Sequence, residues 1–338
     1  MRKTFSIAGA AAMVVALIGG PARGASDDPY LSKQWGLTKI QAEQAWSVAD
    51  GTGATIAIVD TGVDLEHPDL APKLVSAPDA DFSGDLQTDG PQDENGHGTH
   101  VAGIAAAVTG NGIGVAGTAP GASILPVRVL DENGSATAEE VARGVRYAAD
   151  HGADVVNLSL GLPSGTGQVV RLMGAVDSLY DAIDYAWSKG AVVVIAAGND
   201  SVPLCAEPAA APKAVCVGAT DSRDVRSFYS NSDATMTRPF LVAPGGDGVT
   251  CSGNVFSTYL RSAPDTVCSD EPGYEAIAGT SMATPFVSGV AALLASQGLS
   301  NSAIVSCLEQ SAEDLGVPGR DPVYGYGRVN AYRAVSSC

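Results

Sequence analysis

Short apolar runs alternate with longer amphipathic stretches along most of the chain. The apolar runs are rich in β-branched residues and are bounded by glycine or polar residues, which is typical of buried strands. Six segments have this character: 54–59, 123–130, 154–160, 191–197, 214–219 and 240–242. Helical patterns occupy 137–151, 176–189 and 282–296. Strands that alternate with helices predict an α/β fold in three layers, with a mainly parallel central sheet and helices on both faces.

The first 24 residues differ from the rest. Arg2 and Lys3 precede an apolar stretch at 7–18, and small residues follow up to Gly24, which is the pattern of an export signal cleaved after Gly24. The apolar stretch is shorter than the roughly 20 residues that a membrane-spanning helix needs. We therefore expect a secreted, extracellular protein with no membrane segment in its mature form.

No linker or low-complexity tract divides residues 25–338, so we expect one domain. Three residues separate the predicted cleavage site from Asp28, which leaves no room for an inhibitory folding prodomain. The mature domain is thus expected to fold unaided.

Charge and cysteine content narrow the class further. The formal charge of −18 would become −21 on loss of Arg2, Lys3 and Arg23, and so acidic a protein argues against nucleic-acid binding and suits cation binding. Six cysteines in an exported chain indicate disulfides, and six cysteines allow 15 pairings. The sequence leaves the pairing open. Proximity along the chain favours Cys205–Cys216, Cys251–Cys268 and Cys307–Cys338. We expect a monomer.

Three segments carry residues suited to nucleophilic catalysis. Asp60 ends the first predicted strand, His97 lies between two glycines before a helix that runs to about residue 109, and Ser281 precedes the helix at 282–296. A helix N-terminus favours negative charge, and a serine hydroxyl needs a base and a site for an oxyanion. Pro285 is expected in the first helical turn, where its missing N–H has no partner to lose.

Each of these residues also has an ordinary structural explanation. Asp60 could end a strand in a turn, His97 could cap a helix or lie on the surface, and Ser281 could be an N-cap. All three in the order Asp, His, Ser, in a chain with only four histidines, favour a catalytic site.

These blocks resemble the subtilisin-like serine proteases, most closely the thermitase-like branch. The resemblance runs from Asp28 to about residue 334 and includes further matching segments at 58–63, 67–70, 197–199, 243–245 and 327–332. It implies a serine endopeptidase that acts on proteins or peptides. Ser281 would be the nucleophile, His97 the general base and then acid, and Asp60 the group that orients the imidazole. Asn199 matches the side-chain donor of the oxyanion hole, although a strand-end turn residue is its alternative explanation.

The resemblance also implies a structural calcium ion. Its ligands would be the side chains of Asp28, Asp69 and Asn111 and the carbonyls of Val108, Ile113 and Val115, which are the hard oxygen donors that calcium requires. The alternative is a set of solvated polar residues. A second calcium site, with Asp81, Asp89 and Gln92 as candidates, is left open.

Substrate recognition is less well defined. Ser159, Leu160 and Gly161 match the strand that pairs with extended substrate by β-augmentation. Leu162 stands where the family usually has glycine, and an insertion at 164–175 follows, so the primary specificity pocket is undefined. Two alternatives stay open: a dedicated processing protease or peptide ligase for one partner, and a non-catalytic binding protein on this fold. The intact set of Asp60, His97, Ser281 and Asn199 argues against the second.

Overall fold

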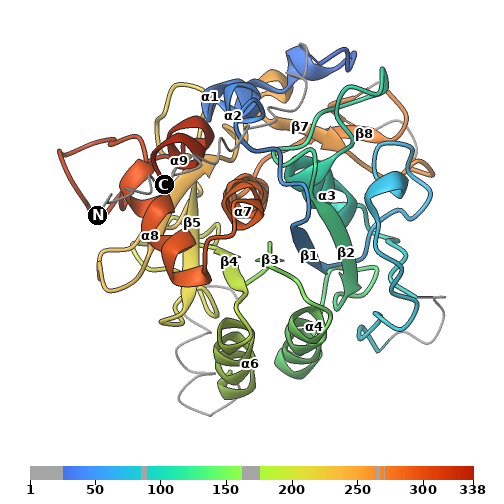
Figure 1. Cartoon of the computed structure of the whole chain (residues 1–338), viewed down its shortest axis with the longest axis horizontal. Helices are drawn as coiled ribbons and strands as arrows, with labels where there is room; N and C mark the ends of the chain where they lie inside the picture. Colours follow the sequence, from blue (N-terminus) through green and yellow to red (C-terminus); the bar gives the residue numbers. More distant parts are fainter. Residues whose placement is uncertain (1–25, 85–89, 162–175, 264–266, 270) are drawn as a thin grey trace, which may run out of the picture.

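A six-stranded parallel sheet forms the centre of the molecule (Figure 1). The computed structural model describes residues 26–84, 90–161, 176–263, 267–269 and 271–338. The strands, in the spatial order β2-β1-β3-β4-β5-β6, are β1 (Thr55–Asp60), β2 (Ser123–Arg128), β3 (Val155–Leu158), β4 (Val192–Ala196), β5 (Ala214–Thr220) and β6 (Phe240–Pro244). Each coincides with one of the six predicted apolar runs, which confirms the predicted α/β fold.

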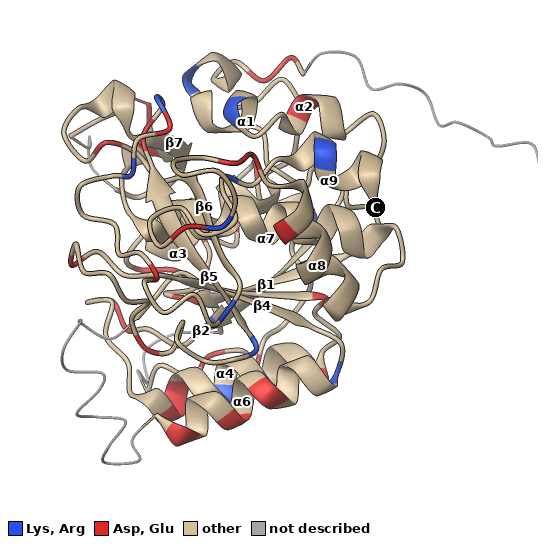
Figure 2. Ribbon diagram, turned by 90° about the vertical axis from the view of Figure 1, so that its left-hand side faces the viewer, with Lys and Arg blue, Asp and Glu red and all other residues tan. Residues whose placement is uncertain are grey.

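Helices cover both faces of this sheet. Those with four or more described residues are α1 (Trp35–Lys39), α2 (Ala42–Ala45), α3 (His97–Ala106), α4 (Ala138–Asp150), α6 (Asp177–Ser188), α7 (Thr280–Ser296), α8 (Asn301–Ser311) and α9 (Ala331–Ser337). Figure 1 shows α4 and α6 on one side of the sheet and α3, α7, α8 and α9 on the other. Figure 2 shows α4 and α6 along the outer edge of the molecule, and acidic residues recur along both helices.

The strands are buried on both faces, which is why their sequences are almost continuously apolar. Ile56 and Ile58 of β1 pack into the core that contains α7, whereas Ala57 and Val59 pack into the core beneath α4 and α6. All four side chains have no exposed surface. Two apolar layers therefore hold the sheet in place, and each strand end is fixed relative to its neighbours.

The order of the strands determines where a site can form. The strand β1 lies between β2 and β3. The next strand in sequence, β2, is added on one side of β1, and the later strands are added on the other side, so the strand order reverses at β1. Open α/β sheets bind ligands outside the carboxyl ends of the strands at such a reversal. Asp60 ends β1, while Ser159 follows β3 and Asn199 follows β4, which brings all three to this edge.

Three disulfides join Cys205 to Cys216, Cys251 to Cys268 and Cys307 to Cys338. These are the three pairs that proximity along the chain favoured. The second disulfide lies beside a small antiparallel sheet of β7 (Val255–Thr258) and β8 (Tyr274–Ile277). Three short 3-10 helices complete the described elements: Leu31–Lys33, Ala71–Lys73 and Cys251–Gly253. Within the described ranges, no helix has the length and apolar character to cross a membrane.

Helix α7 begins at Thr280, two residues before the predicted start. Pro285 consequently lies inside the helix, and its expected place in the first turn was wrong. Its missing N–H would have bonded the carbonyl four residues earlier, which is that of Ser281. The Ser159 hydroxyl donates to this Ser281 carbonyl oxygen instead, at 2.8 Å. The proline thus leaves an acceptor that ties the start of α7 to the end of β3.

Candidate active site

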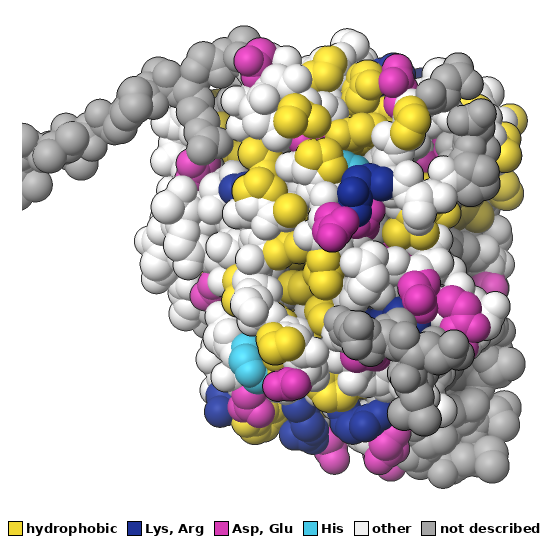
Figure 3. All heavy atoms as spheres, turned by 90° about the vertical axis from the view of Figure 1, so that its right-hand side faces the viewer, with side chains coloured by type: hydrophobic (Ala, Val, Ile, Leu, Met, Phe, Trp, Pro, Cys, Tyr) yellow, Lys and Arg dark blue, Asp and Glu magenta, His cyan; other side chains and the backbone are white. Residues whose placement is uncertain are grey.

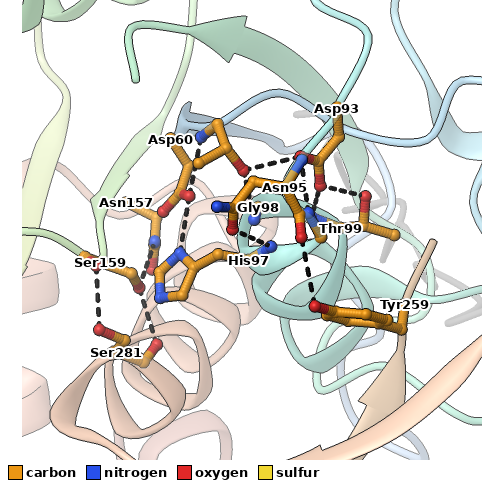
Figure 4. Close-up of polar contacts among 12 residues, drawn as sticks. Asp60, Asp93, Asn95, His97, Gly98, Thr99, Asn157, Ser159, Tyr259 and Ser281 are labelled. Carbon is orange, nitrogen blue, oxygen red and sulfur yellow. Dashed lines mark hydrogen bonds and ion pairs between the residues drawn. The ribbon is translucent and has the colours of Figure 1, made fainter. Parts of the chain in front are cut away.

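The structure places Asp60 and His97 in direct contact (Figure 4). His97 Nδ1 lies 2.7 Å from Asp60 Oδ1, and the same carboxylate oxygen accepts the Thr61 N–H at 2.8 Å. Asp60 is fully buried, while the His97 side chain keeps 27% of its surface exposed. A proton on Nδ1 bonded to Asp60 leaves Nε2 as the free basic nitrogen.

Electrostatics favour the protonated form of His97. Burial alone would lower the pKa of His97, but the charge and hydrogen bond of Asp60, with a contribution from Asp93, raise that pKa above its usual value. The pair therefore provides a base that an adjacent carboxylate strengthens.

The two glycines beside His97 have separate steric causes. A Cβ on Gly98 would lie 2.1 Å from the carbonyl oxygen of Gly62, so only glycine lets α3 approach the end of β1 this closely. Gly96 has a φ of +103°, and a Cβ there would lie 2.4 Å from the ring of Tyr259. The two glycines thus let the end of β1 and the Tyr259 ring pack closely on either side of His97.

Asp93 connects the segments that carry Asp60 and His97, and sequence reasoning missed it. Its Oδ1 accepts the Thr61 hydroxyl and the N–H groups of Asn95 and Gly96, all at 2.9 Å. Its Oδ2 accepts the N–H and the hydroxyl of Thr99. Burial raises the pKa of the Asp93 carboxyl, against the effect of these hydrogen bonds. Its position four residues before His97 is the one sequence signal that could have identified it.

Ser281 lies on the opposite side of the His97 ring from Asp60 in Figure 4. Its hydroxyl donates to the carbonyl oxygen of Ser159 at 3.0 Å, and no hydrogen bond joins it to His97 among the described residues. Rotation of the Ser281 side chain about χ1 would turn the hydroxyl away from Ser159. Catalytic hydrogen bonds are often long or poorly aligned without substrate, so this geometry is compatible with a nucleophile.

A buried polar chain fixes the position of Ser281. The Ser288 hydroxyl of α7 donates to Asn157 Oδ1 at 2.7 Å, and Asn157 Nδ2 donates to the Ser159 hydroxyl at 3.0 Å. The Ser159 hydroxyl in turn donates to the Ser281 carbonyl. These hydrogen bonds therefore connect α7 to the end of β3 at two points, Ser288 and Ser281.

Asn199 has one end of its amide fixed. Its Oδ1 accepts the N–H and the hydroxyl of Thr280, at 2.9 and 3.0 Å, and its Nδ2 donates to no described residue. The Thr280 bonds orient the side chain beside the N-terminus of α7. A free amide N–H next to Ser281 is the donor that an oxyanion hole requires.

Ser159, Leu160 and Gly161 run past Ser281 at the end of β3. Ser159 is buried, Leu160 is half-buried and Gly161 is exposed, so the segment emerges at the surface beside the candidate nucleophile. Leu162 and the insertion at 164–175 lie outside the described residues. The predicted substrate strand is thus placed next to Ser281, although its primary pocket is not described.

The residues predicted to bind calcium come together from three segments. Asp28 accepts the N–H groups of Gly110 and Asn111, and the Asn111 amide donates to Asp69 Oδ1 at 3.0 Å. Asp69 also accepts the N–H of Val115 and the hydroxyl of Tyr274, and it is fully buried. Burial raises the pKa of Asp69 despite these bonds.

The described residues contain no group of three or more His, Cys, Asp or Glu side chains that could hold a metal. The predicted calcium set has only two carboxylates, so it depends on amide and carbonyl oxygens. For the second candidate site, Asp81 accepts from Ser83 at 2.8 Å, and Asp89 lies outside the described residues.

Comparison with known proteins identifies the family. The model of the subtilase family matches residues 51–327, which include Asp60, His97, Asn199 and Ser281. The chain belongs to the subtilase family. It is 47% identical over 310 residues to thermitase from Thermoactinomyces vulgaris, covering 91% of this chain and 98% of thermitase. It is 42% identical to a thermophilic serine proteinase from Bacillus sp. strain AK1, covering 92% of this chain and 69% of that protein.

Solved structures agree with the family. A protease from Pseudoalteromonas arctica superposes with a TM-score of 0.78 at 31% identity, covering 93% of this chain and 99% of that one. A lanthipeptide protease gives a TM-score of 0.79 at 27% identity, covering 93% and 98%. This subtilase is therefore a serine endopeptidase that acts on protein or peptide substrates, and its predicted likeness to the thermitase branch is confirmed.

Proposed function

We propose that this subtilase hydrolyses peptide bonds through an acyl-enzyme formed on Ser281. The single observation that carries the assignment is the 2.7 Å contact between His97 and Asp60, on the side of the imidazole away from Ser281. This contact holds Nδ1 and leaves Nε2 to accept the Ser281 proton.

The proposed reaction has two stages. The Ser281 oxygen attacks the carbonyl carbon of the scissile bond as its proton passes to His97 Nε2, and the Asp60 carboxylate stabilises the imidazolium. The oxyanion receives hydrogen bonds from the Ser281 N–H and the free Asn199 amide. His97 then protonates the departing amine. In the second stage His97 activates a water, which releases the acid and restores the serine.

Covalent labelling tests the assignment of the nucleophile. A biotinylated fluorophosphonate should form one adduct, located on Ser281 by mass spectrometry. Ser281→Ala and His97→Ala should each lose nearly all peptidase activity while keeping the melting temperature of the parent, because the three residues act as a unit. An adduct on another serine would refute the assignment.

Calcium is proposed as a structural ion of this domain. The two carboxylates of Asp28 and Asp69 have only neutral hydrogen-bond donors in the contacts described above, and buried carboxylates need compensation. The amide oxygen of Asn111 and the carbonyls of Val108, Ile113 and Val115 would supply the remaining oxygen ligands. The ion would join the N-terminal segment to two other parts of the fold.

Export is proposed from the pattern of residues 1–24, which lie outside the described residues. The three disulfides support it, because structural disulfides persist in oxidising compartments. A panel of unfolded proteins as substrates would distinguish a broadly acting endopeptidase from a processing enzyme or ligase with one partner.

A further inference from the structure

A pocket lies against the strand β8 and the residues that follow it toward Ser281. It has a volume of about 400 Å³, and its lining includes Tyr259, Val267 and the segment Glu275–Ala278. Ala278 is three residues before Ser281 in the chain. The Tyr259 hydroxyl donates to the Asn95 carbonyl at 3.2 Å, two residues before His97. The pocket wall therefore includes a residue close in sequence to Ser281 and a tyrosine that is hydrogen-bonded to the segment before His97.

Glu275 is the one charged residue among the described lining of this pocket. Its side chain is nearly buried, since only 8% of the residue is exposed, and Oε1 accepts the Ala276 N–H at 2.7 Å. No Lys, Arg or His forms an ion pair with it within the part of the chain that the structure describes. A buried carboxylate without a cation is unfavourable, so its place in an open pocket indicates that a cation from outside completes it.

In another pocket, the carboxylates are neutralised by an arginine of the same chain. This pocket has a volume of about 430 Å³ and is lined by Asp64 and Glu66, but Arg261 also lines it. The Arg261 guanidinium lies 3.0 Å from carboxylate oxygens of both acids. Acidic and basic side chains also lie against one another on the face of the molecule in Figure 3. The chain thus neutralises one acidic pocket internally and leaves the pocket of Glu275 without a described counter-charge.

The position of the pocket assigns it to one half of the substrate. Figure 4 shows Ser159 and Tyr259 on opposite sides of His97. The acyl half of the substrate pairs with Ser159, Leu160 and Gly161 in the function proposed above, so the leaving half must pass toward Tyr259. We propose that Glu275 binds a lysine or arginine side chain within the first three residues after the scissile bond, which makes this subtilase selective for a basic leaving segment.

The pocket suits both parts of such a side chain. Charge-assisted hydrogen bonds to a carboxylate are stronger than neutral ones, and the second Glu275 oxygen is free of described partners. The Tyr259 ring and Ile277 flank the pocket and can cover the aliphatic stem of a lysine or arginine. Burial raises the pKa of Tyr259, with contributions from the charges of Asp93 and Glu275, which agrees with a negative potential at this place.

Fluorogenic peptides with one common acyl half test the proposal. Lys, Gln or Glu is placed in turn at each of the first three positions after the scissile bond, and kcat/KM is measured for each peptide. At one position Lys should exceed Gln by about tenfold or more, as expected for a hydrogen bond to a charged group. Glu275→Gln should bring this ratio close to one, because it keeps the size and the acceptor of the side chain but removes its charge.

Glu66→Gln is the matched control, since Glu66 lies in the pocket that Arg261 already neutralises, and it should leave the ratio unchanged. If Glu275→Gln does not fold, the salt dependence of the parent enzyme tests the proposal instead. The ratio of kcat/KM for the Lys peptide to that for the Gln peptide should be smaller in about 1 M salt than in about 0.01 M salt.

Equal rates for Lys and Gln at all three positions would overturn the proposal, as would a Lys preference that survives in folded Glu275→Gln or is insensitive to salt. This selectivity rests on the proposed function, but the two can be refuted by different results. Hydrolysis of the Gln peptides with no Lys advantage refutes the role of Glu275 alone, whereas no hydrolysis and no fluorophosphonate adduct on Ser281 refutes the proposed function.

Discussion

At the scale of single residues, the two ends of the Asn199 amide have different surroundings. Oδ1 accepts two hydrogen bonds from Thr280, and this fixes the amide plane. Nδ2 has no acceptor among the described residues, so it would be free to donate to the substrate in the proposed function. A donor that is already oriented requires no reorganisation when charge develops on the carbonyl oxygen, so its effect should appear in the transition state rather than in substrate binding.

Replacement of this donor tests its role. Asn199→Ala should lower kcat by about 10²–10³, the effect that loss of one oxyanion donor has in subtilisin, while KM changes little. Steady-state kinetics on a neutral peptide measure both constants. Asn301→Ala is the control. The Asn301 amide donates to the Trp187 carbonyl and has no described contact with the proposed site, so this variant should keep the parent kcat. Full kcat in Asn199→Ala would exclude it from the oxyanion hole.

The pH dependence of the rate tests His97. The proposed base must be neutral, so activity should fall as the pH drops through the pKa of His97. Asp60 and Asp93 face the imidazole with negative charge, and neighbouring His100 has its pKa lowered to about 3 by burial, so it stays neutral. The acid limb of kcat/KM should therefore have its midpoint above the value of about 6.5 for a free histidine. A midpoint below that value would contradict the assignment.

At the scale of elements, the site depends on how α3 meets β1. Asp93 bonds Thr61 at the end of β1 and Thr99 inside α3, so one buried carboxylate fixes the distance between Asp60 and His97. Thr61 also accepts the Gly98 N–H at 2.9 Å. The orientation of His97 thus follows from contacts between two elements that are distant in sequence.

Asp93→Asn should weaken this junction. Either orientation of the new amide places an NH₂ group against donors, which costs about 1–3 kcal/mol in the free energy of unfolding. Loss of one negative charge near His97 should also move the acid limb of kcat/KM to lower pH. Asp131→Asn, which caps an exposed loop in a similar way, should leave that limb in place. Thermal melts and pH–rate profiles of both variants measure the two effects, and an unchanged acid limb in Asp93→Asn would exclude an electrostatic role.

The elements themselves were largely predictable from the sequence. Strands buried on two faces must be apolar throughout, so β1 to β6 were visible as runs, and local spacing predicted the disulfides. The start of α7 was less predictable, because the hydrogen bond that compensates for Pro285 comes from Ser159, which follows β3 and is distant in sequence. Contacts of Asp93 with Thr61, and of Tyr259 with Asn95, are also long-range and leave no local pattern. Asp60, His97, Asn199 and Ser281 could be placed by resemblance, but their hydrogen-bond geometry could not.

At the scale of the whole molecule, distant segments meet around Asp69. Asp28 belongs to the N-terminal segment, Asp69 follows β1, and the loop at 108–115 follows α3. Tyr30 N–H bonds the Gly114 carbonyl at 2.9 Å, and the Tyr274 hydroxyl from β8 bonds Asp69 at 3.0 Å. A single cation here would hold together parts of the fold that no disulfide joins, because the three disulfides all lie after residue 204.

Removal of calcium should therefore destabilise the N-terminal part first. A ligand that binds only the native state stabilises it by about 4 kcal/mol at a thousandfold excess over its Kd. Saturating chelator should lower the melting temperature of the Ser281→Ala protein, in which self-cleavage is absent. In the active enzyme, chelation should expose the segment around Asp28 to self-cleavage before activity is lost, as mass spectrometry of the products would reveal.

Asp69→Ala should reproduce much of the effect of chelator, because it removes a charged ligand from the proposed calcium cage. The variant should then respond little to added calcium, whereas Asp131→Ala should keep the response of the parent. Without calcium, the carboxylates of Asp28 and Asp69 in the parent would remain buried with only neutral hydrogen-bond donors. The bound ion, rather than the loop itself, is therefore expected to stabilise this part of the fold. An unchanged melting temperature after chelator has removed all bound metal would mean that Asp28, Asp69 and Asn111 are only a hydrogen-bonded loop.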